Sequence, residues 1–225
     1  MTGQQIYDNV VAELSTIPGY PMPLSPNHFV RLLNAVMQEV HAQASIYHRR
    51  VVLTLEANKR YQNWPGGEPE PLAFLKASYM VRHLRILYPM QYPGTVDTDE
   101  NYSEDASEPK AIWIERDPVS DKVLLGVEPV PDDTYKIHAT VKLPLPAYTL
   151  WASELPTVIE SHSVIRDGIL SKLYSLGKSF HENTQKALLF QQYQAGIVML
   201  RQLEQRLVAA PPINTTSYVY EQMGF

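Results

Sequence analysis

Residues 125–137, L-G-V-E-P-V-P-D-D-T-Y-K-I, constrain the fold of this chain more than any other stretch. Proline fixes φ and lacks a backbone N–H, so Pro129 and Pro131 cannot lie in a central strand, whereas aspartate tolerates turn geometry. The residues that follow alternate in the manner of a strand: Tyr135, Ile137, Ala139 and Val141. The stretch predicts a strand that stops at Pro129, an ordinary hairpin turn and a second strand, which indicates a structural role.

Composition narrows the class of protein. The chain has 225 residues, 44% of them hydrophobic and 19% charged, enough to bury one sizeable core or two small ones. The net charge of −5 argues against wrapping of nucleic acid, so any DNA contact has to be local. The absence of cysteine excludes disulfides, thiolate nucleophiles and cysteine-ligated metals. No stretch approaches the ~20 apolar residues of a membrane span, and the first residues lack the pattern of a signal peptide, which predicts a soluble protein with no membrane partner.

Two helices are expected near the N-terminus. Residues 4–14 carry apolar residues at helical spacing, and the prolines of residues 17–26 end this segment. Ser25 followed by Pro26 is a typical helix start, because serine caps the helix and proline suits its first position. The second helix should reach about Ile46, with one apolar stripe made of Phe29, Leu32, Leu33, Val36 and Val40.

The middle of the chain has the composition of β structure. Residues 48–65 predict a hairpin that turns at Asn58 and Lys59, although a helix continuing through Leu55 is an alternative for residues 48–57. Residues 72–87 predict a further strand region. Residues 111–116, 122–127 and 134–143 predict three short strands that join the hairpin in one antiparallel sheet.

Residues 96–109 contain six acids and no base. Low hydrophobicity with one sign of charge predicts a solvated, mobile loop. A calcium site is the alternative, because Asp97, Asp99 and Asn101 alternate, but the glycine and glutamate of an EF-hand loop are missing.

The last third of the chain predicts two long helices. The first should start at Pro156 and end at Gly177, with an apolar face of Val158, Ile159, Ile165, Ile169, Leu173 and Leu176. A capping box at residues 179–182 starts the second, which should run ~30 residues to about Ala210. Its expected seam is Leu189, Gln192, Tyr193, Gly196, Leu200, Leu203 and Leu207, and the small residues Ala195 and Gly196 permit close approach of a neighbour. Such a length indicates end-to-end packing on the other helices or a role in an oligomer.

No residue pattern predicts catalysis. His41 and His48 are not joined by a carboxylate in an H-E-x-x-H motif, and His162, beside Glu160, Ser161 and Ser163, lacks a G-x-S-x-G elbow. Phosphate-binding glycine motifs are also missing from the sequence. We therefore expect no catalytic residue, no cofactor and no metal site.

The order of the elements resembles one family. The features are a helical N-terminus, a β region with Trp64-Pro65, the turn P-x-P-D-x-x-Y that ends at Tyr135, and a strand that ends in K-L-P. They continue with L-P-x-x-I-x-x-H at residues 155–162 and I-x-D-G at residues 165–168. In this order, over about residues 26–208, they resemble the head-to-tail adaptor (connector) proteins of tailed bacteriophages. Trp64 and the acidic residues 96–109 depart from the family pattern.

The resemblance implies an α+β fold and a structural function. It implies a helical bundle of residues 1–47 and 150–210, an inserted antiparallel β domain of residues 48–149, and an extended docking arm of residues 211–225. The protein would form a ring, usually of twelve copies, that lies under the portal protein, extends the DNA channel and carries a tail nozzle or other tail proteins. Double-stranded DNA would pass without sequence-specific binding. The anchors of the arm on the portal would be Ile213, Tyr218, Tyr220 and Phe225. The protein would be assembled in the host cytoplasm and reside at the head–tail junction of the virion.

Two other hypotheses stay open. One is a hydrolase that uses His162 or a divalent cation at Asp97, Asp99 and Glu100. The other is a carbohydrate-binding or host-recognition module of a phage tail with an aromatic surface, made of Tyr79, Tyr88, Tyr92 and Trp113.

Overall fold

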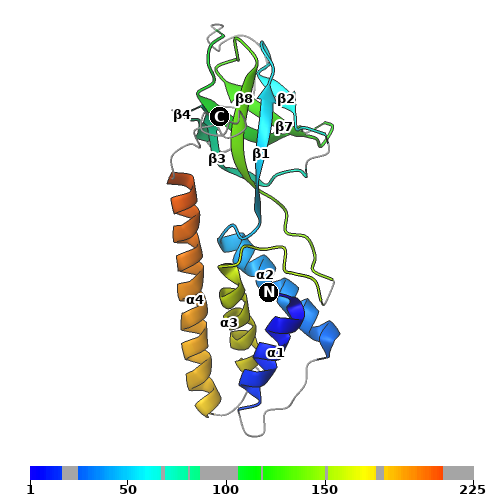
Figure 1. Cartoon of the computed structure of the whole chain (residues 1–225), viewed down its shortest axis with the longest axis vertical. Helices are drawn as coiled ribbons and strands as arrows, with labels where there is room; N and C mark the ends of the chain where they lie inside the picture. Colours follow the sequence, from blue (N-terminus) through cyan, green and yellow to red (C-terminus); the bar gives the residue numbers. More distant parts are fainter. Residues whose placement is uncertain are drawn as a thin grey trace, which may run out of the picture. The chain divides into compact units, whose positions relative to one another are not determined.

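The computed structural model of the chain describes residues 1–16, 25–66, 69–80, 82–86, 106–117, 119–149, 152–175 and 180–209. Four helices and eight strands in two sheets give an α+β protein in this part of the chain, as the sequence predicts (Figure 1). The chain divides into two compact units. Met1–Tyr47 and Leu145–Arg206 form the first unit, which is helical, and the second unit includes His48–Pro144, which holds the strands.

The first two helices begin at side-chain caps. In α1 (Gly3–Leu14) Thr2 and Gln5 form a capping box, in which the Gln5 N–H donates to Thr2 Oγ1 and the Thr2 N–H donates to Gln5 Oε1. In α2 (Pro26–Gln43) Ser25 accepts from the His28 N–H, and Pro26 occupies the first turn as predicted. Four residues of the predicted α2 stripe are buried, and the fifth, Leu32, is half-buried.

Helix α2 ends at Gln43, before the predicted limit at Ile46. Ala44 is extended, and the backbone beyond it is bonded to distant parts of the chain. The Ser45 N–H donates to Glu204 Oε2, and Ile46 O accepts from the Val158 N–H. These bonds commit the backbone of Ser45 and Ile46 to partners outside α2, so the helix does not continue through them.

Helix α3 (Ser161–Tyr174) begins later than predicted, because Pro156 does not start it. The Val158 N–H is bonded to Ile46 outside any helix, and turns carry the chain from there to Ser161. Ile159 is consequently 79% exposed and not part of the apolar face, whereas Ile165, Ile169 and Leu173 are buried as predicted. Helix α4 (Phe180–Ala209) has the predicted length of 30 residues.

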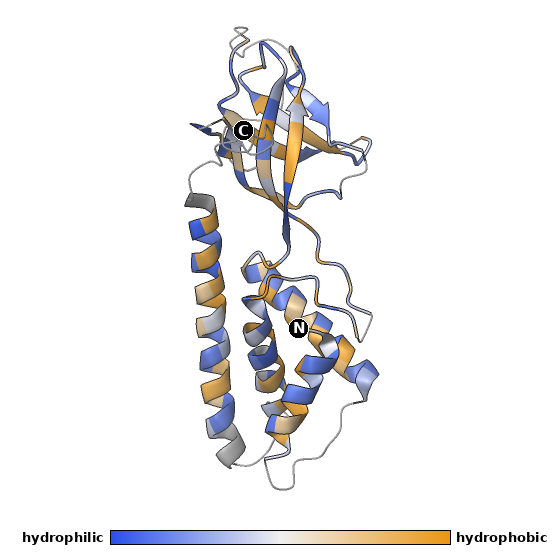
Figure 2. Ribbon diagram, viewed as in Figure 1, coloured by the Kyte–Doolittle hydropathy of each residue, from blue (hydrophilic) through white to orange (hydrophobic). Residues whose placement is uncertain are grey.

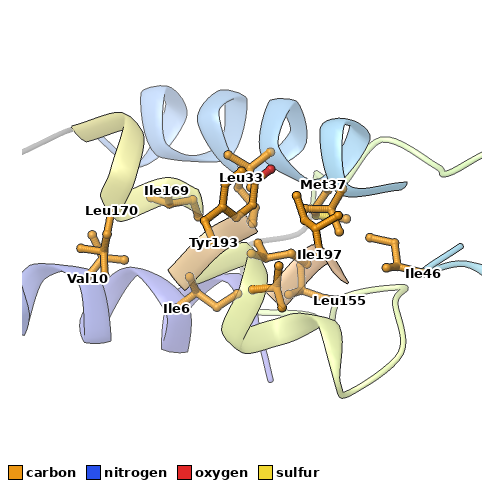
Figure 3. Packing of buried hydrophobic residues seen from close by; sticks show 14 of the residues in the cluster. Ile6, Val10, Leu33, Met37, Ile46, Leu155, Ile169, Leu170, Tyr193 and Ile197 are labelled. Atoms are coloured by element: carbon orange, nitrogen blue, oxygen red, sulfur yellow. The ribbon is translucent and has the colours of Figure 1, made fainter. Parts of the chain in front are cut away.

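One apolar core joins the four helices (Figure 3). Ile6 and Val10 of α1, Leu33 and Met37 of α2, Ile169 and Leu170 of α3, and Tyr193 and Ile197 of α4 belong to it. Two glycines permit the close contacts. A Cβ at Gly168 would lie 2.7 Å from both Tyr193 and Val36, and one at Gly196 would lie 2.7 Å from Val164. The close approach predicted at Gly196 is thus confirmed.

The second unit contains two four-stranded sheets. The first has the strand order β1 (His48–Leu55), β8 (Tyr135–Lys142), β3 (Ala73–Tyr79) and β4 (Arg82–His83). The second has the order β2 (Tyr61–Asn63), β7 (Val123–Glu128), β6 (Ala111–Arg116) and β5 (Arg85–Ile86). All pairs are antiparallel except β5 with β6, which is parallel. The prediction of one antiparallel sheet is therefore wrong.

Both predicted hairpins are also wrong, although their strands lie where the sequence places them. Residues 48–55 form a strand and not a helix, but β1 pairs along its whole length with β8, while β2 pairs with β7. Asn58 turns with a φ of 58°, and its N–H donates to Pro131 O. β7 and β8 belong to different sheets, and Val130 O accepts from the Ser107 N–H. The backbone of each turn is thus hydrogen-bonded to a distant segment of the unit, and the two strands that the turn connects pair with other strands.

Several predicted features lie outside the described residues. They include the acidic residues 97–105, Leu176, Gly177, Ser179 with its capping box, and the C-terminal residues 211–225. Within the described residues, no helix is both long and apolar enough to cross a membrane.

Candidate interaction surface on helix α4

A narrow seam holds α4 in the first unit. Leu189, Tyr193, Ile197 and Leu200 are each at most 8% exposed and recur at helical spacing. Of the other predicted seam residues, Gln192 and Leu203 are exposed, and Gly196 and Leu207 are half-buried. The buried seam is thus narrower than predicted, and it includes Ile197, which was not among the predicted residues.

Polar contacts fix the register of α4 against α2 and α3. The Tyr193 hydroxyl donates to Glu39 Oε1 at 3.0 Å, and Lys172 Nζ lies 2.7 Å from Glu39 Oε2. Burial and the neighbouring Glu39 carboxylate raise the pKa of Tyr193, so its hydroxyl stays a donor. Near the other end, Arg201 donates to Gln43 O at 2.9 Å, and Glu204 accepts from the Ser45 N–H at 3.1 Å. One face of α4 is therefore occupied by contacts with α2, α3 and residues 43–45 of its own chain.

The remaining faces of α4 carry large apolar side chains in water. Leu188 is 55% exposed, Phe190 53%, Val198 50%, Met199 43% and Leu203 37%. Figure 2 shows apolar residues recurring along the helix. An α-helix turns about 100° per residue. Leu188, Met199 and Leu203 therefore lie on one flank of the buried seam, and Phe190 and Val198 lie on the opposite flank.

We call these residues the two apolar flanks of α4. A helix with a single apolar face needs one neighbour. Apolar residues on several sides are typical of a helix that is buried all round. Apolar side chains that recur along one helix mark an interaction site more strongly than a single exposed residue such as Ile159. Large apolar side chains are thus exposed on both flanks of the buried seam. In the sequence, this surface could have been inferred from Phe190, Val198 and Met199, which are apolar but lie outside the predicted seam.

The four predicted anchors of the docking arm, Ile213, Tyr218, Tyr220 and Phe225, lie outside the described residues. Their expected contact with a portal protein stays a prediction.

The residues of the hydrolase hypothesis do not form a catalytic pair. His162 is only 6% exposed at the start of α3, and burial lowers its pKa. The hydroxyl of the adjacent Ser161 donates to Val158 O at 2.7 Å, and Ser161 is completely buried. Among the described residues, no three His, Asp or Glu side chains come together in the manner of a metal site. The proposed cation ligands Asp97, Asp99 and Glu100 lie outside those residues.

The aromatic surface of the glycan-binding hypothesis is not formed by Trp113. This side chain is completely buried, and Gly126 of β7 lies against its ring. Tyr79 packs edge-on against Tyr135 with ring centres 4.9 Å apart. Tyr88 and Tyr92 are not among the described residues.

No protein-family model matches this chain, and no curated protein matches its sequence.

Proposed function

We propose that this protein is a structural head-to-tail adaptor of a tailed bacteriophage. In this proposal it forms a ring beneath the portal, extends the DNA channel and provides the platform for tail attachment, without catalysing a reaction. The observation that carries the proposal is the pair of apolar flanks on α4, because they require protein neighbours on two sides of one helix. The order of sequence motifs from Trp64 to Gly168 supports the same assignment.

The two flanks favour a ring over a symmetric dimer. A two-fold dimer buries the same patch on both copies, and one flank would stay in water. Contact between different patches is heterologous, so each copy leaves one flank open for the next, and the series closes into a ring when the rotation fits. Side-by-side α4 helices would bury Leu188, Met199 and Leu203 of one copy against Phe190 and Val198 of the next. The rotation that relates neighbouring copies sets the number of copies in the ring. The resemblance implies twelve.

The parts of the chain then have separate tasks. The helices of residues 1–47 and 150–210 form a bundle that is the body of the ring, and the inserted residues 48–149 add a β domain for tail proteins. Residues 211–225 form the arm that docks on the portal through Ile213, Tyr218, Tyr220 and Phe225, since large aromatic side chains dominate such interfaces. The place of function is the head–tail junction of the virion.

Electron microscopy with the portal protein encoded alongside this chain tests the docking arm. We expect a ring of added density under the portal with the full chain and none after deletion of residues 211–225. The triple variant Tyr218→Ala, Tyr220→Ala and Phe225→Ala should also lose the ring. A matched triple variant in the same segment, Thr215→Ala, Thr216→Ala and Ser217→Ala, should keep it. Added density with the truncated chain would contradict the role of the arm.

Variants of α4 test the ring contacts separately. We expect Leu188→Gln with Met199→Gln, or Phe190→Gln with Val198→Gln, to prevent the ring on the portal while the circular dichroism spectrum stays unchanged, because these side chains are exposed in the single chain. The control Ile159→Gln removes an apolar side chain that is 79% exposed but lies outside α4, and should leave ring formation intact. Rings of normal size from both double variants would contradict the proposal.

A further inference from the structure

Strand β1 forms one edge of the first sheet in the second unit, beside β8 (Figure 1). It pairs with β8 over all its eight residues without a bulge, and it contains no proline. Within the described residues, no strand pairs with the other side of β1. A long and regular edge strand exposes a row of backbone donors and acceptors, which a further strand can bind. We call this side of β1 the open edge.

The hydrogen bonds of β8 show which backbone groups of β1 face the open edge. Lys142 O accepts from the N–H of Leu72, directly before β3, so the backbone of Lys142 points toward β3 and away from β1. Backbone direction alternates along a strand, so every second residue of β8 points the same way, and the partners of these residues on β1 point away from β8. Arg50, Val52 and Thr54 are such partners, and all three are exposed.

The open edge ends where a side chain takes over. The Glu56 N–H points in the same direction as those of Arg50, Val52 and Thr54, and it donates to Gln62 Oε1 at 3.0 Å. In the part of the chain that the structure describes, no backbone hydrogen bond reaches the other three residues from this side. An antiparallel strand laid along the open edge would exchange two hydrogen bonds with each of them.

The outer face of the open edge matches the sequence of residues 217–221, S-Y-V-Y-E. In an antiparallel alignment Glu221 is opposite Arg50, and Val219 is opposite Val52, which is 57% exposed. Pairs of opposite charge and pairs of β-branched residues are both favourable across strands. The same alignment places a hydroxyl side chain opposite Thr54.

The inner face of the same alignment is apolar. Residues of a strand alternate between the two faces, so Tyr218 and Tyr220 lie on the side of Leu53 and Val51, which are buried. A shift of one residue would turn both tyrosines outward and bring Ser217 to the buried side, so the register is specified. Tyrosine and valine are also among the residues that favour strands.

We propose that residues 217–221 of the same chain bind the open edge as a further antiparallel strand of the first sheet. Residues 210–216 tether this segment to α4, and a tethered segment acts at an effective concentration on the order of millimolar. A second copy reaches that concentration only in concentrated solution. The segment includes Tyr218 and Tyr220, which the proposed function assigns to the portal, so the portal and the open edge compete for them. This competition rests on the proposed function, whereas the added strand does not.

Hydrogen exchange of the full chain, measured at single amides by NMR, tests the strand without any portal protein. We expect the amides of Arg50, Val52 and Thr54 to exchange about 10-fold more slowly in the natural chain than in Val219→Pro. The proline removes the N–H that faces Val52 O, and its ring does not fit a ladder. The matched control Asn214→Pro introduces the same ring outside residues 217–221 and should keep the slow exchange.

A charge exchange tests the register. Arg50→Glu and Glu221→Arg each place like charges opposite one another and should speed the exchange of the Val52 amide roughly 2- to 5-fold, and the double variant should restore it. Arg49→Glu makes the same change one residue away on the other face of β1, and Glu221→Arg should not rescue it. Circular dichroism checks the fold of each variant, and Arg50→Gln replaces the charge reversal where that variant is unfolded.

Three results would overturn the proposal. One is equally fast exchange in the natural chain and in Val219→Pro, and another is slow exchange that both proline variants keep, which would mean that something else covers the edge. The third is slow exchange that is lost on dilution, which would assign the strand to a second copy. Adding the portal protein separates the two proposals. Portal binding should speed the exchange at the open edge, and slow exchange without portal binding would contradict the proposed function alone.

Discussion

Gly126 lies opposite Trp113 in the ladder of β6 and β7, and the indole ring covers the position that a Cβ would occupy. A Cβ built on Gly126 would lie 2.0 Å from Trp113 Cε2, far inside van der Waals contact. Trp113 is completely buried, so its ring has no solvent side toward which it could move. The packing of the second sheet therefore depends on a single residue without a side chain.

We expect Gly126→Ala to lower the free energy of unfolding of the second unit by roughly 2 kcal/mol, the usual cost of overpacking a core. Urea unfolding followed by tryptophan fluorescence measures this change. Gly66→Ala is the matched control, because a Cβ at Gly66 meets no atom within 4 Å. An equal effect of the two substitutions would show that the contact with Trp113 is not the cause.

His162 gives the first unit a dependence on pH. Because burial lowers its pKa below the ordinary value of about 6.5, the unfolded chain takes up a proton at a higher pH than the folded chain. The stability that neutral His162 contributes is thus present above about pH 6.5 and is lost as the pH falls toward the folded pKa. His162→Gln should flatten the fall in stability between pH 7 and pH 5, measured by urea unfolding at each pH. His28→Gln, at an exposed position, should keep the natural slope.

Local chemistry explains which residues could be predicted from the sequence. Ser25 and Pro26 start α2 as expected, because a cap and its helix are three residues apart and need no other part of the chain. Pro156 fails to start α3 because the Val158 N–H is bonded to Ile46, more than 100 residues earlier. A bond over that distance leaves no signal in the neighbouring sequence.

Among the elements, α4 is held by polar contacts in addition to its buried seam. The Tyr193 hydroxyl is bonded to Glu39, which is also the partner of Lys172. Tyr193→Phe should therefore lower the free energy of unfolding of the first unit by about 1 kcal/mol, because it removes one hydrogen bond from a buried ring. Urea unfolding followed at 222 nm measures it. Tyr135→Phe removes an exposed bond to Asp132 and should leave the midpoint unchanged.

Strand positions were predictable at the element scale, but strand partners were not. The alternation of Leu53 and Leu55 marks a strand with one buried face, whichever strand lies beside it. The partner of β1 is β8, some 80 residues later, and not the neighbouring β2, and the alternation within β1 carries no information on which strand lies beside it. On α4, the sequence indicated a seam but placed Gln192 and Leu203 in it, because helical spacing alone does not define how wide a buried face is.

The described part of the chain has two sets of buried residues, one in each unit, and we expect the two units to unfold separately. The apolar cluster that joins the four helices lies within the first unit, and the buried Trp64 and Trp113 lie in the second. In a Trp151→Phe background, fluorescence reports on the second unit and the signal at 222 nm reports mainly on the helices. We expect Gly126→Ala to shift the fluorescence transition to lower urea and to leave the 222 nm transition in place. A joint shift of both transitions would mean that the units unfold together.

His48, the first residue of β1, is paired with Lys142, the last residue of β8. Partners in an antiparallel ladder have Cα atoms only ~5 Å apart, so the segment His48–Pro144 ends near the point where it begins. We therefore expect this segment to be replaceable without unfolding the helical unit. Its removal, duplication or replacement by an unrelated domain leaves a gap between Tyr47 and Leu145 that a few glycine and serine residues can close. The four helices should then stay folded without the β segment.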